Sequence, residues 1–346
     1  MGGEKMRAAR CELLVNASEV AVVGLAEVVT RLPAIRRRFK SMVAEAKKRR
    51  PDAAVLIDFP DFNLRLAREL HKLNIPVFYF VSPQIWAWRT GRVRQIRKYV
   101  RKMIVIFPFE QEFYRKHGVD VAYVGHPLAQ EPVFEASRQE FAAQNGLSFA
   151  KQWIALLPGS RKKEVRLNLP EILESARMLA GQSAGYEFVL PVASTLDKDW
   201  LREQLAASPM QAQIHLNSNS RATLLHAHAA VVASGTATVE AALAGTPFVV
   251  VYRLAPLTWL LGRRLVSLDT FAMPNLIAGR RIVTELIQKD FTAANVVREL
   301  NAIIPDGQAR RQMLADLQEV REKLRDSRSP EAPAARAARE ILGSLN

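Results

Sequence analysis

The chain of 346 residues is 49% hydrophobic and carries a formal net charge of +15, a composition that suits two globular α/β domains. Its single cysteine, Cys11, excludes an internal disulfide framework and a cysteine-rich metal site. No uninterrupted apolar run reaches the ~18 residues of a membrane span, and charges occupy the N-terminal stretch where a signal peptide would be apolar.

The excess of positive charge favours anionic partners, which include nucleic acid, phosphorylated substrates and acidic lipid headgroups. The charge alone does not choose among these partners. The absence of a leader and of a membrane span leads us to expect a cytoplasmic or peripheral protein.

Short apolar runs alternate with helical stretches along the whole chain. Continuous apolar strands between helices are typical of parallel sheets covered on both faces, so the pattern predicts an α/β fold with two doubly wound domains. The predicted strands are 53–57, 77–81, 103–107 and 121–124 in the first half, and 153–157, 187–191, 213–216, 229–233 and 248–251 in the second. A polar linker over 125–148 separates the halves, which gives domains at 1–148 and 149–308 and C-terminal helices over 309–346.

The first predicted strand ends at Asp58, where catalytic groups of α/β folds cluster. A partly buried carboxylate there would have a raised pKa and could act as a general base. Helix capping is an equally good role for Asp58, although Asp61 and Asn63 are better placed to cap a helix over 64–73.

An aromatic and basic stretch follows the second strand. Trp86, Trp88 and Arg89 precede a helix that carries Arg94, Arg97, Lys98, Arg101 and Lys102. Aromatic residues beside a cationic helix suit a membrane interface with anionic lipid, and a solvated basic face is the alternative. A later apolar and basic stretch with Trp259 and Arg263 could also contact lipid or an acyl chain.

Two loops in the second half point to a phosphorylated ligand. The sequence LPGSR follows the strand 153–157 and places Ser160, a predicted helix cap, beside Arg161, whose forked guanidinium suits a diphosphate. The strand 229–233 leads into Ser234, Gly235 and Thr236 at the start of a helix, where free backbone N–H groups favour an anion.

Two further residues could complete a nucleotide site. Glu240 lies further along the helix that follows Ser234, where a carboxylate could accept hydrogen bonds from ribose hydroxyls. Asn275, in the sequence MPNLIAGR, is a plausible polar ligand group. Ordinary capping and loop roles are the alternatives for both loops and for these residues.

In this order, the motifs SPQIWAWR, LPGSR, ASGTATVE and MPNLIAGR resemble those of the lipid-A-disaccharide synthase family. The likeness runs from about Gly2 to beyond Leu300. It implies a GT-B fold, in which two Rossmann-like domains face a cleft and C-terminal helices pack back on the first domain. The ASGT block alone is shared more loosely with other UDP-sugar enzymes of this fold.

The resemblance implies an inverting glycosyltransferase that joins UDP-2,3-diacylglucosamine to 2,3-diacylglucosamine 1-phosphate (lipid X) and releases UDP, without a metal or other cofactor. Asp58 would be the general base, and Arg161 would stabilise the leaving diphosphate. The donor would contact Ser160, Arg161, Ser234, Gly235, Thr236, Glu240 and Asn275. The protein would lie on the inner face of the inner membrane of a Gram-negative bacterium, bind no nucleic acid, and could form a homodimer through its C-terminal helices.

One departure from the family pattern concerns the beginning of the chain. Family members open with a strand and a Gly-Glu-Ala-Ser-Gly-Asp loop, neither of which occurs in this sequence. We expect the first domain to lack that strand, through either start-site placement or a truncation that would impair activity. The rival hypotheses are another UDP-sugar enzyme, such as an N-acetylglucosaminyltransferase or a 2-epimerase, and a non-catalytic basic protein that binds nucleic acid or membrane.

Overall fold

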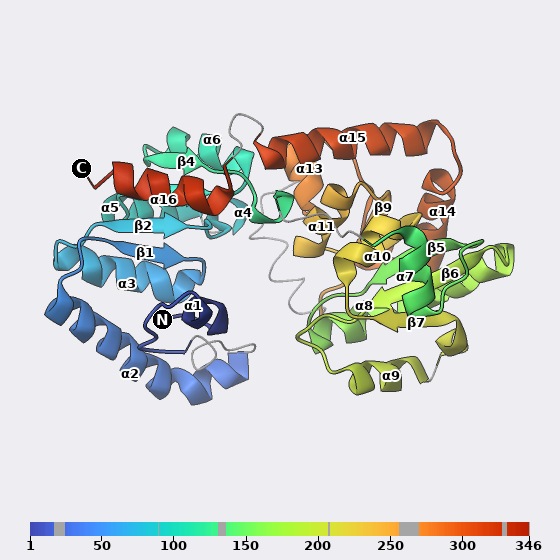
Figure 1. Cartoon of the computed structure of the whole chain (residues 1–346), viewed down its shortest axis with the longest axis horizontal. Coiled ribbons are helices and arrows are strands. Elements are labelled where there is room, and N and C mark those ends of the chain that lie inside the picture. Colours follow the sequence, from blue (N-terminus) through green and yellow to red (C-terminus); the bar gives the residue numbers. More distant parts are fainter. Residues whose placement is uncertain are drawn as a thin grey trace. The chain divides into compact units, whose positions relative to one another are not determined.

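A computed structural model describes residues 1–16, 25–88, 90–130, 136–206, 208–255, 270–326 and 331–345. The chain forms two compact units, and we describe each by itself (Figure 1). Unit 1 comprises Met1–Ile106, Glu110–Val124 and Ala334–Asn346, and unit 2 comprises Phe107–Phe109 and Gly125–Pro333.

Unit 1 contains a four-stranded parallel sheet in the order β1-β2-β3-β4. The strands are Ala54–Ile57 (β1), Val77–Phe80 (β2), Lys102–Val105 (β3) and Val121–Tyr123 (β4). The helices are Glu4–Ala8 (α1), Leu25–Arg49 (α2), Pro60–Lys72 (α3), Ile85–Trp88 (α4), Val93–Tyr99 (α5), Pro108–Lys116 (α6) and Pro333–Gly343 (α16).

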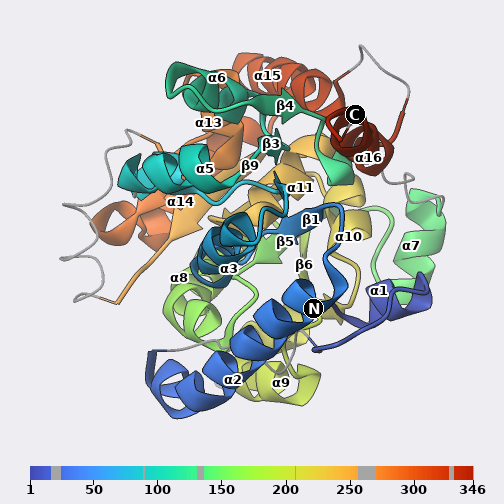
Figure 2. The same cartoon turned by 90° about the vertical axis from the view of Figure 1, so that its left-hand side faces the viewer.

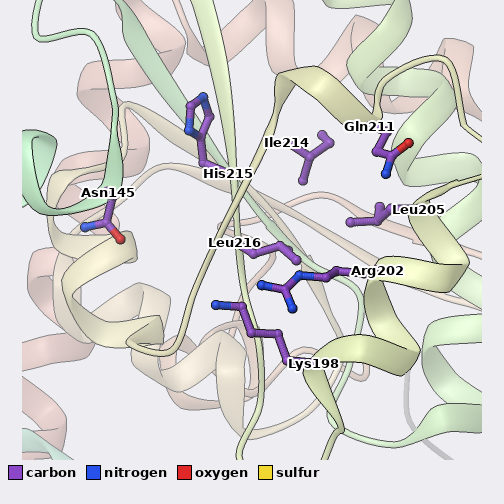
Figure 3. A pocket seen from close by; sticks show the side chains of 8 residues that line it. All are labelled: Asn145, Lys198, Arg202, Leu205, Gln211, Ile214, His215 and Leu216. Carbon is purple, nitrogen blue, oxygen red and sulfur yellow. The ribbon is translucent and has the colours of Figure 1, made fainter.

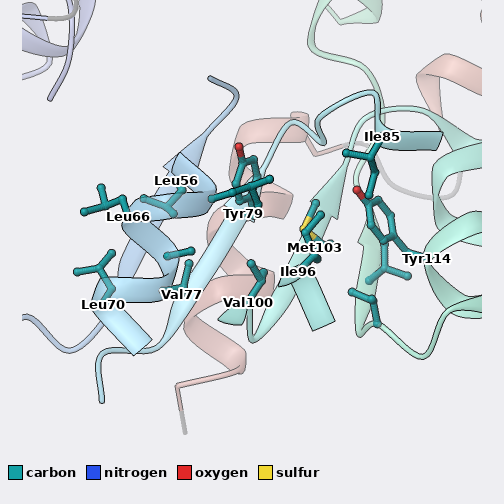
Figure 4. Packing of buried hydrophobic residues seen from close by; sticks show 14 of the residues in the cluster. Leu56, Leu66, Leu70, Val77, Tyr79, Ile85, Ile96, Val100, Met103 and Tyr114 are labelled. Carbon is teal, nitrogen blue, oxygen red and sulfur yellow. The ribbon is translucent and has the colours of Figure 1, made fainter. Parts of the chain in front are cut away.

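The two faces of this sheet have different covers, because successive side chains of a strand point to opposite faces. Tyr79 and Met103 join the larger core, to which α3, α5 and α6 contribute (Figure 4). Phe80 and Ile104 lie on the opposite face, where they pack with Ala337 of α16. α3 itself lies against β1 and β2 (Figure 2). The last helix of the chain therefore belongs to the core of unit 1.

Unit 2 contains a six-stranded parallel sheet in the order β10-β9-β8-β5-β6-β7. The strands are Gln152–Leu157 (β5), Tyr186–Pro191 (β6), Ile214–Asn217 (β7), Ala229–Ala233 (β8), Phe248–Tyr252 (β9) and Glu285–Ile287 (β10). The helices are Arg138–Asn145 (α7), Lys162–Gln182 (α8), Lys198–Ala206 (α9), Ser220–His226 (α10), Thr236–Ala244 (α11), Met273–Ala278 (α13), Ala293–Ile303 (α14) and Gln308–Arg325 (α15).

The topology of unit 2 is doubly wound, as the sequence predicts. The chain builds outward from β5 to β7, returns to β8 on the other side of β5, and continues to β10. This is the Rossmann strand order, and the direction reverses between β5 and β8. All nine predicted strands are present in the two units, and the three-residue edge strand β10 is an addition.

The units divide the chain differently from the domain limits placed on the sequence. The stretch after Gly125 belongs to unit 2, because Phe141 of α7 and Leu147 pack with Trp153 of β5. α15 also belongs to unit 2, whereas α16 returns to unit 1. The stretch after Gly125 has the polar, proline-containing composition of a linker. Its few apolar residues, such as Phe141 and Leu147, nevertheless anchor it to the sheet that follows.

The residues at the start of the long segment of unit 2, Gly125 and His126, contact the end of α15. Gly125 has a φ of +87°, and a Cβ at this position would lie 3.4 Å from the Leu324 carbonyl oxygen. The next residue, His126, donates its N–H to the same carbonyl at 2.9 Å. The His126 ring is buried beside Phe107, with its Nδ1 accepting the Leu128 N–H at 3.2 Å.

Candidate functional site

Two loops of unit 2 meet at the point where its strand order reverses. β5 and β8 are hydrogen-bonded neighbours, with Leu157 opposite Val232, so both strands end at the same edge of the sheet. The loop that contains Ser160 and Arg161 follows β5, and the turn at Ser234 follows β8. Ligands of doubly wound folds bind in the crevice at this edge. The structure therefore brings together the two loops that the sequence singles out.

The turn after β8 presents backbone donors to solvent. Gly235 has φ 145° and ψ −161°, a conformation that strongly favours glycine, and both Gly235 and Thr236 are exposed. The Thr238 N–H bonds the Gly235 carbonyl at 3.1 Å, and the Ser234 N–H bonds Val251 at 3.0 Å. The amides of Gly235, Thr236 and Ala237 lie between these bonds, in the first turn of α11, where helix amides have no acceptor within the helix. Such a turn suits a phosphate.

The loop after β5 is held differently. The Glu164 carboxylate accepts the N–H groups of Ser160 at 3.0 Å and Arg161 at 3.3 Å, and the Arg161 guanidinium donates to the same carboxylate at 3.2 Å. Gly159 has a φ of +129°, and a Cβ there would lie 2.7 Å from the Glu164 Cβ. The Glu164 carboxylate thus binds the two amides that precede the first turn of α8, and Arg161, rather than Ser160, is the N-cap. What the loop exposes to a ligand is the Arg161 side chain, 67% exposed.

Glu240 lies on α11 within the same unit. Its Oε2 accepts the Ser220 hydroxyl at 2.9 Å, and the side chain is partly exposed. This contact joins the start of α10, which follows β7, to α11. The carboxylate keeps further acceptor positions, since each carboxylate oxygen has two lone pairs.

Asn275 has contacts unlike those expected of a ligand group. It is 1% exposed, and its amide nitrogen donates to the Val283 carbonyl at 3.0 Å and to Glu285 at 2.7 Å. Its amide oxygen accepts the N–H groups of Ile282 at 2.7 Å and Val283 at 3.0 Å. These four bonds use both donors and both lone pairs, so Asn275 holds the segment before β10 in place.

Asn168 is a residue of the site region that sequence reasoning missed. It is fully buried on α8, donates to the Pro158 carbonyl at 2.9 Å, and accepts the Arg253 N–H at 3.0 Å. These bonds tie the loop after β5 to the end of β9. The signal was an amide among the apolar positions Val165 and Leu169 of one helix, since a buried polar group needs partners.

In unit 1, unusual backbone conformations gather at the ends of β1 and β2. Asp58 and Phe59 have φ values of +46° and +49°, and Val81 has a φ of +64°. A positive φ is rare for residues other than glycine, and it is a true outlier for a β-branched residue such as valine. Strained residues of this kind cluster at functional sites.

Buried side chains hold the Asp58 backbone in this conformation. The Asp58 carbonyl accepts the Tyr79 hydroxyl at 2.6 Å and the Asn63 amide at 2.7 Å. Burial, and secondarily the Asp58 charge, raise the pKa of Tyr79 above its usual range, so the phenol remains a donor. The Asp58 side chain is exposed, which corrects the expectation of a partly buried carboxylate. The backbone is fixed while the carboxylate faces solvent.

The expected capping roles of Asp61 and Asn63 are also wrong. α3 begins at Pro60 with Phe59 as its N-cap, and no side chain caps it. Asp61 instead forms an ion pair with Arg92 at 2.5 Å. Proline fixes φ at a helical value and has no N–H to satisfy, so it starts the helix four residues before the predicted position.

The predicted lipid contacts are only partly within the described residues. The Trp86 indole donates to the buried Glu110 carboxylate at 3.1 Å, and the Trp86 ring is half-buried. Arg89, Trp259 and Arg263 lie outside the described residues, as does the side chain of Trp88. Among the helices that the structure describes, none has the length and hydropathy to cross a membrane.

Another pocket of unit 2 lies away from these loops, at the edge strand β7, and encloses ≈ 400 Å³. Lys198 and Arg202 of α9 line it together with His215 of β7 (Figure 3). His215 points to the opposite face of β7 from Leu216, and Arg202 is paired with Asp199 at 2.6 Å. The basic groups therefore do not converge on one point.

Comparison with known sequences matches almost the whole chain to a protein family. The family model described as lipid-A-disaccharide synthetase matches residues 1–339. A lipid-A-disaccharide synthase of Koribacter versatilis (strain Ellin345) is 55% identical over 342 residues, which cover 99% of this chain and 89% of that protein. Another, from Myxococcus xanthus (strain DK1622), is 40% identical over 345 residues, with coverages of 100% and 89%.

Comparison with solved structures supports the fold. The UDP-GlcNAc 2-epimerase of Neisseria meningitidis, bound to UDP-GlcNAc, is similar with a TM-score of 0.56 and 14% identity, and the match covers 93% of this chain and 82% of that chain. CalG4, the calicheamicin glycosyltransferase, is similar with a TM-score of 0.53 and 15% identity, covering 94% and 82%.

Proposed function

Because the chain belongs to the lipid-A-disaccharide synthetase family, we propose that it joins UDP-2,3-diacylglucosamine to 2,3-diacylglucosamine 1-phosphate with inversion, releasing UDP. Its relatives are hexosyltransferases of lipid A biosynthesis, and its two Rossmann-like units have the GT-B architecture of nucleotide-sugar enzymes. The observation that carries the proposal is the exposed Ser234 turn at the reversal point of unit 2, in a chain of this family.

The donor diphosphate binds in unit 2. The amides of Gly235 and Thr236 donate to it, since they are the exposed orphan donors of α11. The Arg161 guanidinium, released from Glu164, pairs with the same group. As the bond from the sugar to the diphosphate breaks, negative charge grows on the leaving oxygen, and these donors stabilise it. Glu240 then accepts hydrogen bonds from the ribose.

The acceptor is activated in unit 1. The exposed Asp58 carboxylate accepts the proton of the 6-hydroxyl as that oxygen attacks the anomeric carbon of the donor. Tyr79 and Asn63 do not touch substrate in this proposal and act as positioning residues, because they bind the Asp58 carbonyl. Asn275, with all its hydrogen-bonding positions filled, contributes through the shape of the loop and not through the donor.

The acylated substrates lead us to propose that the protein works at the inner face of the inner membrane as a peripheral protein. A basic helix, α5, supports an approach to anionic lipid. Exchange of the C-terminal helices α15 and α16 between two copies would give a homodimer, and molar mass in solution would test this.

The deciding experiment measures UDP release in detergent solution with both acylated substrates. Turnover that requires both substrates is expected, with a product that carries the β configuration. Turnover of non-acylated UDP-N-acetylglucosamine without the acceptor would instead indicate a 2-epimerase. Absence of UDP binding, with salt-sensitive binding of nucleic acid, would overturn the assignment to an enzyme.

A further inference from the structure

A groove between α5 and the end of α6 gathers positive charge away from the strand ends. It encloses ≈ 370 Å³ and is lined by Val93, Arg94, Arg97, Lys116, His117 and Gly118. Gly118 has a φ of +66° and ends α6 in a turn that leads into the beginning of β4. Because all strands of the sheet are parallel, this wall lies toward the end opposite Asp58.

The charge in this groove is poorly compensated. Between Glu69 and Glu110 the sequence contains no acidic residue, while α5 carries several basic ones. Within the described ranges, Arg94 and Arg97 form no ion pair, and both are exposed. Lys116 pairs with Glu112 at 2.7 Å, but both side chains are about 70% exposed, and such surface pairs contribute little.

The geometry of the groove fits one phosphate. Arg94 and Arg97 are three residues apart, so they lie one turn from each other on the same face of α5. Lys116, the last residue of α6, and His117 line the same space. Guanidinium and ammonium groups around a small concave space are the usual arrangement for binding a phosphoryl group.

We propose that this groove binds the phosphate headgroup of an anionic phospholipid at the bilayer surface, outside the substrate site. The inference rests on the proposed function, which brings the protein to a membrane to meet acylated substrates. Lys98 of α5 is exposed, as is Arg101, which lies between α5 and β3 and not on the helix that the sequence predicts there, and both extend the positive surface to neighbouring headgroups. A single phosphate with its glycerol is small enough for this space, whereas a nucleic acid duplex would need phosphate contacts along its length.

The test is sedimentation of the full chain with phosphatidylcholine vesicles that either contain or lack phosphatidylglycerol. Each basic residue near an anionic surface contributes roughly fivefold in affinity, so Arg94→Gln with Arg97→Gln should weaken binding to the anionic vesicles about 30-fold. Arg94→Lys with Arg97→Lys should retain most of the binding, because the charge remains.

The matched control is Arg36→Gln with Arg37→Gln on α2, which removes the same charge from another exposed helix of unit 1. An equal loss in both double variants would show diffuse attraction and overturn the headgroup site. Thermal unfolding of each variant separates loss of the site from loss of the fold.

Two further arms separate the sources of phosphate and the rival partner. Glycerol 3-phosphate and inorganic phosphate should compete only weakly, because they lack the surface that the neighbouring lysine and arginine residues engage. If either displaces the protein from vesicles at low concentration, the ligand is a free phosphate and the lipid assignment is wrong. Tighter binding to duplex DNA than to anionic vesicles, lost in the same variant, would also overturn it. UDP release in detergent reports separately on the proposed function.

Discussion

The strand ends of unit 1 and of unit 2 prepare their chemistry in different ways. After β5 and β8, the two neighbouring strands of unit 2 whose loops form the candidate site, the unusual φ angles fall on Gly159 and Gly235. In unit 1 they fall on Asp58, Phe59 and Val81, which have side chains and adopt such angles only under constraint. Glycine leaves the backbone amides of the turn after β8 open to an anion, whereas buried partners of Asp58 fix the backbone that carries its carboxylate.

The largest effect is expected when the Asp58 carboxylate of unit 1 is removed. Asp58→Asn should lower kcat by about 10²–10⁴-fold, because the amide cannot accept the proton of the attacking hydroxyl. The affinity for UDP should stay within about twofold, since Asp58 belongs to unit 1. Steady-state rates and calorimetric titration with UDP measure the two quantities. Comparable activity of variant and parent would remove Asp58 from the base role.

Acid should destabilise unit 2, because its buried His126 is held neutral in the folded protein. Burial lowers the pKa of His126 to about 4, against an ordinary value of 6.5, so the folded protein holds the ring neutral. The unfolded chain binds the proton more readily, and stability is lost as pH falls from about 6.5 to about 4, by up to about 3 kcal/mol. Urea unfolding across this range measures the loss.

The control for this pH effect is His126→Asn, whose side-chain oxygen can replace Nδ1 as acceptor of the Leu128 N–H. The variant has no imidazole to protonate. Between about pH 6.5 and pH 4 its free energy of unfolding should therefore fall by up to about 3 kcal/mol less than that of the parent. Parallel pH dependences in the two proteins would show that other groups control acid sensitivity.

A change at Gly235 tests the role of glycine in unit 2. No heavy atom lies within 4 Å of a Cβ built there, so Gly235→Ala introduces no clash. The cost comes from φ 145°, which is unfavourable for alanine by about 1–3 kcal/mol, and the turn should relax away from its binding conformation. UDP affinity should fall by about 10–100-fold. Gly343→Ala, in the last turn of α16, is the control, with UDP affinity unchanged.

The smallest effect is expected when one of the hydrogen bonds that hold the Asp58 backbone in unit 1 is removed. Tyr79→Phe removes one of the two donors to the Asp58 carbonyl, leaves Asn63 in place, and keeps the ring in the core. A neutral hydrogen bond contributes about 1 kcal/mol, so kcat should fall about fivefold with UDP affinity unchanged. A loss of stability with no change in kcat would give Tyr79 a purely structural role.

The sequence predicts the fold more fully than the site. All nine predicted strands are present because continuous apolar runs specify strands buried on both faces, whereas β10 is short and lies at an edge. The loops at Arg161 and Ser234 were identifiable because glycine and polar residues follow such strands directly. The hydrogen-bond partners of Glu164 and Asn168 could not be identified in this way, because hydrogen bonds across a loop depend on packing that local sequence does not encode.

The same limit explains the errors at Asp58 and Asn275. A position after a strand predicts which edge a side chain lies at, but not whether it is buried, and Asp58 proved to be exposed. An asparagine beside a proline can face a ligand or close a loop, and four internal bonds give Asn275 the second role. Those bonds involve residues that no sequence pattern pairs with Asn275.

The position of α16 has a consequence for how the protein is made. Ala337 packs with Ile104 and Val124, Arg336 donates to the Tyr123 carbonyl at 3.2 Å, and Glu340 binds Lys102 at 2.9 Å. On a ribosome, the sheet of unit 1 is therefore synthesised long before the helix that covers its second face. Unit 2 has all its strands and α15 first, so it can complete its core while unit 1 still exposes Phe80 and Ile104. The unit whose synthesis begins first is therefore the last to have all of its chain available.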